Sequence, residues 1–113
     1  MKDFPSLQLE HKHLVEVQKL IQKHVPNASA VAYGSRVKGK ATRTSDLDIV
    51  LLCPNSDRAF VGDLREAFEE SDLPFIVDLQ VWEDLPADFQ NEIRAEHCFL
   101  TLNEATLDPS FRQ

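Results

Sequence analysis

The sequence predicts one domain with an α/β (α+β) fold, and two observations support this class. Helical and strand-like hydrophobic patterns alternate along the chain, with Pro or Gly residues between them. The length of 113 residues matches one domain and leaves no room for a second. We therefore expect residues 1–113 to form one unit, with flexible ends at residues 1–7 and 103–113.

The first half of the chain is expected to form one helix followed by two strands. Residues 8–24 carry apolar side chains at helical spacing, with charged residues between them. The short apolar runs at residues 30–33 and 47–52 indicate strands, because Gly34 and Pro54 end them.

The second half of the chain is expected to add two helices and one or two strands. Residues 57–71 carry one apolar face, which is typical of an amphipathic helix. Residues 75–82 alternate as in a strand and place Asp78 on the face opposite the apolar side chains. A last helix is expected over residues 86–96, because proline suits a first helical turn. The apolar run at residues 98–102 is either an edge strand or a segment that faces a partner.

Composition and charge exclude several classes of protein. The net charge of −7 argues against general binding to nucleic acid, which requires a basic surface. No stretch approaches the roughly 18 apolar residues of a membrane span, and the first residues lack the apolar run of a signal peptide. Cys53 and Cys98 are far apart and indicate small core residues in a reducing compartment. These features predict a soluble, cytoplasmic protein without membrane association.

Asp46 and Asp48 are the strongest chemical signal in the sequence. Both precede or enter an apolar strand, so their side chains project from the same face. Such a pair supplies the hard oxygen ligands with which Mg²⁺ bridges a protein to substrate phosphates. Asp78, on the polar face of the next strand, is the candidate for a third carboxylate. Taken singly, each residue would be assigned to solvated surface, but half-buried carboxylates on an apolar strand need a compensating partner.

Residues 34–39 have the features of a phosphate-binding loop. A strand that runs into Gly34 and a short helical turn presents unpaired backbone N–H groups to a ligand. Gly34 permits close approach, and the Ser35 hydroxyl adds a donor. Four basic residues fall within the eight positions that follow Ser35, and we expect Arg36 or Lys38 to contact phosphate.

The same loop also matches part of a P-loop, and we reject that alternative. Residues 34–40 satisfy G-x-x-x-x-G-K after a short strand. The next residue is Ala41, so the Ser or Thr that binds Mg²⁺ is missing. Residues 40–44 are also too few for the long helix that packs beneath a P-loop.

Gly34-Ser35, followed after about ten residues by Asp46-x-Asp48, resembles the signature of the polymerase-beta-type nucleotidyltransferase superfamily. The short chain resembles the minimal, MNT-type branch of that superfamily, and the resemblance spans residues 14–82 in the order of elements. It implies the nucleotidyltransferase fold, a mixed β-sheet with helices packed on one side.

The resemblance also implies a role for each candidate residue. Asp46 and Asp48 would hold two Mg²⁺ ions, and Asp78 would complete one metal site and take the proton from the attacking hydroxyl. Gly34 and Ser35 would hold the outer phosphates of ATP. Attack at the α-phosphate would then release pyrophosphate.

Small members of this branch are often paired with a small all-helical protein, so the resemblance implies a hetero-oligomer. In HEPN/MNT toxin–antitoxin pairs the MNT member is the antitoxin and adenylylates a tyrosine of the toxin. A related pairing uses a helical substrate-binding protein. The alternative hypothesis is a catalytically silent nucleotide-binding module that neutralises or scaffolds its partner by direct binding, with residues 98–102 as apolar surface.

Overall fold

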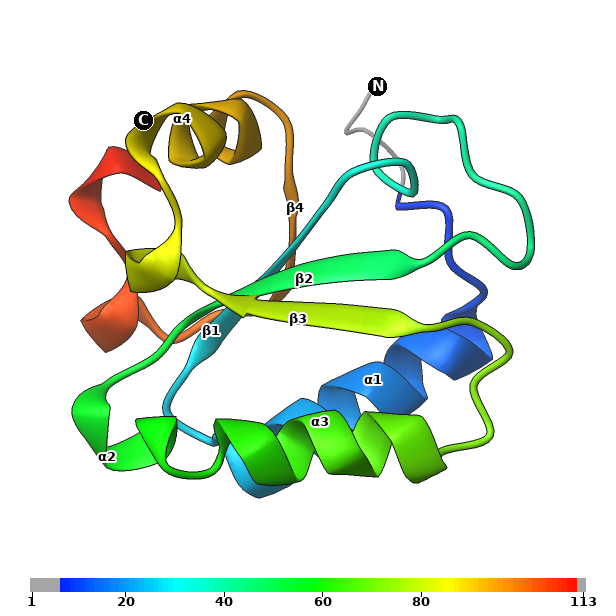
Figure 1. The fold of residues 1–113 in the computed structure, drawn as a ribbon, viewed down its shortest axis with the longest axis horizontal. Coiled ribbons are helices and arrows are strands. Elements are labelled where there is room, and N and C mark those ends of the chain that lie inside the picture. The colour runs from blue at the N-terminus through cyan, green and yellow to red at the C-terminus, as the bar shows by residue number, and fades with distance from the viewer. Residues whose placement is uncertain (1–6, 112–113) are drawn as a thin grey trace.

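A mixed four-stranded sheet forms the centre of the computed structural model, which describes residues 7–111 (Figure 1). In sheet order the strands are β3 (Val77–Val81), β2 (Leu47–Leu52), β1 (Ser29–Tyr33) and β4 (Cys98–Thr101). β1 is antiparallel to β2 and β4, whereas β2 and β3 are parallel. The predicted mixed sheet is confirmed, and the last apolar run forms the edge strand β4. Residues 1–6 and 112–113, which belong to the ends expected to be flexible, lie outside the described residues.

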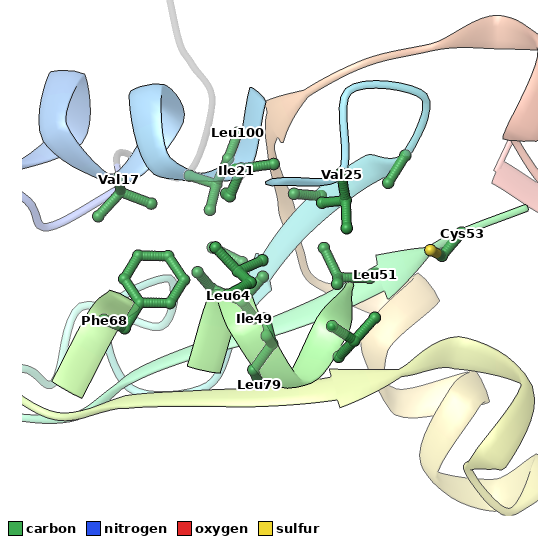
Figure 2. Close-up of a cluster of buried hydrophobic side chains, with 14 of the residues drawn as sticks. Val17, Ile21, Val25, Ile49, Leu51, Cys53, Leu64, Phe68, Leu79 and Leu100 are labelled. Carbon is green, nitrogen blue, oxygen red and sulfur yellow. The ribbon is translucent and has the colours of Figure 1, made fainter. Parts of the chain in front are cut away.

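The two longest helices lie on one face of this sheet (Figure 1). They are α1 (His11–His24) and α3 (Val61–Glu70), and both have the apolar stripe that the sequence pattern predicted. In Figure 2, Ile21 of α1 and Leu64 of α3 lie in one cluster with Ile49 of β2, and all three are fully buried. Burial of each such side chain contributes about 2 kcal/mol, so this layer holds both helices to the sheet.

The prediction of one continuous helix over residues 57–71 is wrong, because the structure has two helices in this region. α2 (Asn55–Arg58) is one turn, and α3 begins only at Val61. The Asp57 carboxylate is buried and accepts hydrogen bonds from the Asn27 backbone N–H at 2.8 Å and the Asn27 side-chain amide at 3.3 Å. This contact fixes α2 to the turn before β1, and a local hydrophobic pattern cannot reveal it.

The last helix, α4 (Ala87–Ala95), lies on the opposite face and is the exception to the expected one-sided packing (Figure 1). Val31 and Tyr33 of β1, Val50 of β2 and Ile93 of α4 are buried together in a second apolar cluster. Strands that are apolar on both sides need cover on both sides. α1 and α3 share one face of the sheet as predicted. The apolar side chains of β1 and β2 that point to the opposite face are covered by α4.

Residues 103–111, which were expected to be flexible, pack against the sheet beside α4. The Asp108 carboxylate accepts hydrogen bonds from Trp82 Nε1 at 3.1 Å and from the Ser110 N–H at 2.9 Å. The Phe111 ring lies 5.0 Å from the Trp82 ring, measured between centroids. The two Trp82 contacts join parts of the chain that are distant in the sequence and pack the C-terminal segment against the rest of the fold.

Cys53 and Cys98 are free thiols. Cys53 is buried in the core beside α1 and α3, and Cys98 packs against the same cluster, as predicted for small core residues. Burial, with a smaller contribution from the nearby Asp57 carboxylate, raises the pKa of the Cys53 thiol to about 11. Within residues 7–111, no helix is long and apolar enough to cross a membrane.

Candidate active site

Three side chains of the candidate site form a row across the sheet. The strand register pairs Tyr33 of β1 with Asp48 of β2, and Asp48 with Asp78 of β3. Side chains at paired positions project from the same face of a sheet, so the phenol and both carboxylates lie on the α4 side. Asp46 precedes β2 by one residue and is exposed. The structure therefore brings Asp48 and Asp78 side by side, as the strand patterns predicted. Together with Asp46 they are called the carboxylate row.

Negative charge is concentrated around Asp48. Burial, and then the charges of Asp78 and Asp46, raise the pKa of the Asp48 carboxyl to about 6. Burial and the same two strand carboxylates, Asp48 and Asp78, also raise the pKa of Tyr33. Gln80 donates a hydrogen bond to Asp78 Oδ1 at 3.3 Å. With the described residues, none of the three aspartates forms an ion pair, so the cluster favours a bound cation.

The donor set of the cluster fits Mg²⁺. Asp46, Asp48 and Asp78 offer the hard carboxylate oxygens that this ion prefers. In the part of the chain that the structure describes, no three His, Cys, Asp or Glu side chains are arranged to hold an ion by themselves. Mg²⁺ usually keeps several waters and completes its ligand shell with substrate phosphates. An open set of carboxylates therefore suits it better than a closed cage would.

The loop after β1 has the backbone geometry of a phosphate-binding turn. Gly34, with φ of +84°, ends the strand, and its carbonyl accepts hydrogen bonds from the N–H groups of Val37 at 3.0 Å and Lys38 at 3.1 Å. The N–H groups of Ser35 and Arg36 have no partner among residues 7–111. Unpaired N–H groups at the start of a helical turn are suited to bind an anion.

Gly34 and Asp48 are in direct contact, which links the loop to the carboxylate row. A β-carbon at Gly34 would lie 2.3 Å from Asp48 Oδ2, far inside normal contact distance. The φ of Gly34 also lies in the left-handed region that side chains disfavour. Glycine is therefore required at this position for two independent reasons, and one of them concerns the carboxylate itself.

The two basic candidates of the loop have different surroundings. Arg36 is only 5% exposed, and its guanidinium donates hydrogen bonds to backbone carbonyls of the protein. Lys38 is exposed and lines a cavity together with Gly34 and Asp48. Ser35, which stands between Gly34 and Arg36 in the chain, is partly exposed. Of the two side chains expected to contact phosphate, Lys38 is the one that lies at the cavity.

This cavity, of about 290 Å³, lies between the carboxylate row and α4. On the α4 side it is lined by Phe89, Glu92, Ile93 and Glu96. The Phe89 ring packs edge-on against Tyr33, with ring centroids 5.5 Å apart. Glu92 and Glu96 were not predicted from the sequence as site residues. Their i+3 and i+7 spacing from Phe89 was the available signal.

The glycine-serine loop and the carboxylate row fall within one segment that matches a known family. The sequence profile described as "Nucleotidyltransferase domain" matches residues 14–101, which include both features. The chain belongs to this nucleotidyltransferase family, as the resemblance of its motifs implied.

The chain is similar in sequence to a probable protein adenylyltransferase and in fold to two toxin–antitoxin structures. The chain is 38% identical over 109 residues to the probable protein adenylyltransferase MntA of Haemophilus influenzae, with 96% of each chain covered. A crystal structure of a toxin–antitoxin with AMP-PNP is similar at a TM-score of 0.65 and 20% identity, over 85% of this chain and 77% of that one. The toxin–antitoxin MntA–HepT is similar at a TM-score of 0.52 and 18% identity, over 80% and 71%. At these identities the two structures show a shared fold alone.

Proposed function

We propose that this chain is a Mg²⁺-dependent protein adenylyltransferase that moves AMP from ATP to a tyrosine hydroxyl of a small helical partner protein. The observation that carries the proposal is the row of carboxylates beside a loop with unpaired N–H groups. The name of the Haemophilus influenzae relative supports a protein acceptor. The chain and its partner would form a hetero-oligomer in which this chain is the antitoxin. We place the activity in the cytoplasm, where ATP is available and free thiols stay reduced.

In this mechanism the loop after β1 binds the outer phosphates of ATP. The unpaired N–H groups of Ser35 and Arg36 donate to phosphate oxygens, and the Ser35 hydroxyl adds a third donor. The Lys38 ammonium, which lines the cavity, offsets phosphate charge. Because Gly34 has no side chain, the loop stays close to Asp48, and the α-phosphate is brought to the carboxylates.

The carboxylate row performs the transfer itself. Asp46, Asp48 and Asp78 would hold two Mg²⁺ ions, which when bound offset the negative charge that develops on the phosphates. The acceptor oxygen forms a bond to the α-phosphorus, and the bond from that phosphorus to pyrophosphate breaks. Asp78, the exposed end of the row, takes the proton of the acceptor hydroxyl. AMP is thereby left on the acceptor, and pyrophosphate leaves.

A catalytically silent nucleotide-binding module is the second candidate, and exposed apolar residues favour it. Leu102 follows the edge strand β4 and is 55% exposed, and Ile76 precedes the edge strand β3 and is 69% exposed. Exposed apolar side chains at sheet edges suit direct contact with a partner protein. In this alternative the chain neutralises or scaffolds its partner by binding, and the carboxylates serve only to retain nucleotide.

Transfer of radioactive label distinguishes the two candidates. The wild type and the Asp46→Asn/Asp48→Asn double variant are each incubated with α-³²P-ATP, Mg²⁺ and clarified lysate of the source organism. Adenylyl transfer predicts a labelled protein band with the wild type only, and loss of that band when EDTA is added. If neither protein labels a band while both retain the same small helical partner, the binding-module candidate replaces the enzyme.

A further inference from the structure

Arg36 is a buried cation whose hydrogen bonds go to the backbone of three other residues. Nη1 donates to the carbonyl of Gln8 at 2.6 Å, Nη2 to that of Arg43 at 3.0 Å, and Nε to that of Ser45 at 3.0 Å. The guanidinium carbon also lies 4.4 Å from the centroid of the Phe75 ring. A guanidinium is tolerated in a buried position only where its donors find partners, and these contacts supply them.

Gln8, in the segment before α1, completes this arrangement. Its N–H donates to the Arg36 carbonyl at 2.7 Å, so the two residues exchange hydrogen bonds. Its side-chain Oε1 accepts a hydrogen bond from the Ala41 N–H at 3.1 Å. We call Arg36 and Gln8 the loop clamp, because together they contact the loop between β1 and β2 in its middle, at residue 41, and near its end, at residues 43 and 45.

The loop clamp connects the phosphate-binding turn to the first carboxylate. Arg36 directly follows Ser35, and Ser45, whose carbonyl Arg36 binds, directly precedes Asp46. We propose that Arg36 is a positioning residue that fixes the placement of Asp46 relative to Ser35, and that it is not a phosphate ligand. This inference rests on the proposed nucleotidyl transfer for its functional consequence.

The contacts of Arg36 oppose a direct role in binding ATP. To reach a phosphate, the guanidinium would have to leave three carbonyls and the Phe75 ring, and those carbonyls would lose a charged donor. Lys38 carries the same charge on the same loop but is exposed at the cavity. Lys38 is therefore the matched comparison for a test of Arg36.

Steady-state kinetics separate positioning from phosphate binding. Arg36→Lys keeps the charge but replaces the three nitrogens of the planar guanidinium with one, which cannot reach all three carbonyls, so Asp46 is expected to shift. We expect kcat for AMP transfer to fall at least about tenfold, with little change in KM for MgATP. Lys38→Met is expected to raise KM for MgATP instead. If Arg36→Lys raises KM as much as Lys38→Met and leaves kcat unchanged, Arg36 is a phosphate ligand and the inference is wrong.

Amide hydrogen exchange tests the clamp without any need for activity. Gln8→Ala removes the side-chain oxygen that accepts from the Ala41 N–H but keeps the backbone carbonyl that Arg36 binds, so it is the variant that tests the Gln8 part of the clamp alone. We expect exchange over residues 39–46 to be about tenfold faster in Arg36→Lys, exchange at Ala41 alone to be faster in Gln8→Ala, and both to be unchanged in Lys38→Met. Wild-type exchange over residues 39–46 in a folded Arg36→Lys, or in Arg36→Gln if Arg36→Lys does not fold, would overturn the inference. If the wild type transfers no label but exchange changes as expected, the clamp holds the loop and only the proposed function fails.

Discussion

Replacement of Gly34 by alanine tests the coupling between the phosphate-binding loop and Asp48. At Gly34, φ is +84° and an added β-carbon would lie 2.3 Å from Asp48 Oδ2. Gly39→Ala is the matched control, because φ there is +76° and nothing lies within 4 Å of the added atom. Both variants introduce the same backbone strain, but only Gly34→Ala displaces a carboxylate.

The two effects have different expected magnitudes. Left-handed backbone costs an alanine about 1–2 kcal/mol, so each variant is expected to melt roughly 4–15 °C below the wild type. In Gly34→Ala, the Asp48 oxygen must also move by about 1 Å to reach normal contact distance. A displacement of that size at a reacting group lowers the rate on the order of 100-fold. We therefore expect similar melting temperatures but very different activities.

The assay is the initial rate of AMP transfer at saturating MgATP, with thermal unfolding followed by circular dichroism on the same samples. The expected result is a rate for Gly39→Ala within a few-fold of the wild type and a rate for Gly34→Ala about 100-fold lower. Equal rates for the two variants, or a wild-type rate for Gly34→Ala, would refute the reasoning that Gly34 is needed to place Asp48.

Three further predictions concern thiol reactivity, the C-terminal segment and α3. Because the pKa of the Cys53 thiol is raised to about 11, iodoacetamide at pH 8 should leave Cys53 unmodified in the native chain and modify it in urea; rapid native modification, read by peptide mass spectrometry, would contradict this. Asp108→Ala removes the acceptor of the Trp82 and Ser110 hydrogen bonds and should lower the free energy of unfolding in urea by about 2 kcal/mol. Hydrogen bonds from Ser110, first of all from its backbone N–H, lower the pKa of Asp108 in the folded chain. The loss of unfolding free energy in Asp108→Ala should therefore be present above the ordinary aspartate pKa and disappear as pH falls through the lowered pKa of Asp108. A loss that does not depend on pH would contradict this prediction. Gly62→Ala, inside α3 with nothing near the added β-carbon, should raise the free energy of unfolding by about 0.5–1 kcal/mol, and a decrease would show an unrecognised contact.

The arrangement of the strand carboxylates followed from local sequence patterns. The period of two along a strand put Asp46 and Asp48 on one face, and the alternation around Asp78 put it on the polar face of the next strand. Because β2 and β3 are adjacent and parallel, these local preferences were sufficient to bring Asp48 and Asp78 together. Their roles in metal binding and proton transfer stay predictions.

The surroundings of Arg36 could not be predicted in the same way. In the sequence, Arg36 belongs to a run of basic residues that would normally be an exposed surface. Its burial depends on carbonyls from residues 8, 43 and 45, which converge only when the chain is folded. Non-local hydrogen bonds to backbone carbonyls leave no mark on hydrophobic periodicity.

The packing of the C-terminal segment could not be predicted from local sequence either. The polar composition after residue 103 indicated a loose end, yet Asp108 accepts a hydrogen bond from Trp82, which is 26 positions away. The position of α4 likewise depends on β1 and β2, whose apolar residues on both faces need cover. That residues 87–95 form a helix was therefore predictable from their own sequence, whereas the face of the sheet that this helix covers depends on β1 and β2.

The most direct test of the proposed catalysis is mass spectrometry of the labelled partner protein after reaction with wild type or with Asp48→Asn, an isosteric variant that removes one charge from the row. We expect the partner from the wild-type reaction to carry one or more AMP groups on tyrosine, and the partner from the Asp48→Asn reaction to be unmodified. AMP on the partner in the Asp48→Asn reaction, or an unmodified partner with the wild type in the presence of MgATP, would contradict the assignment of nucleotidyl transfer to this carboxylate row.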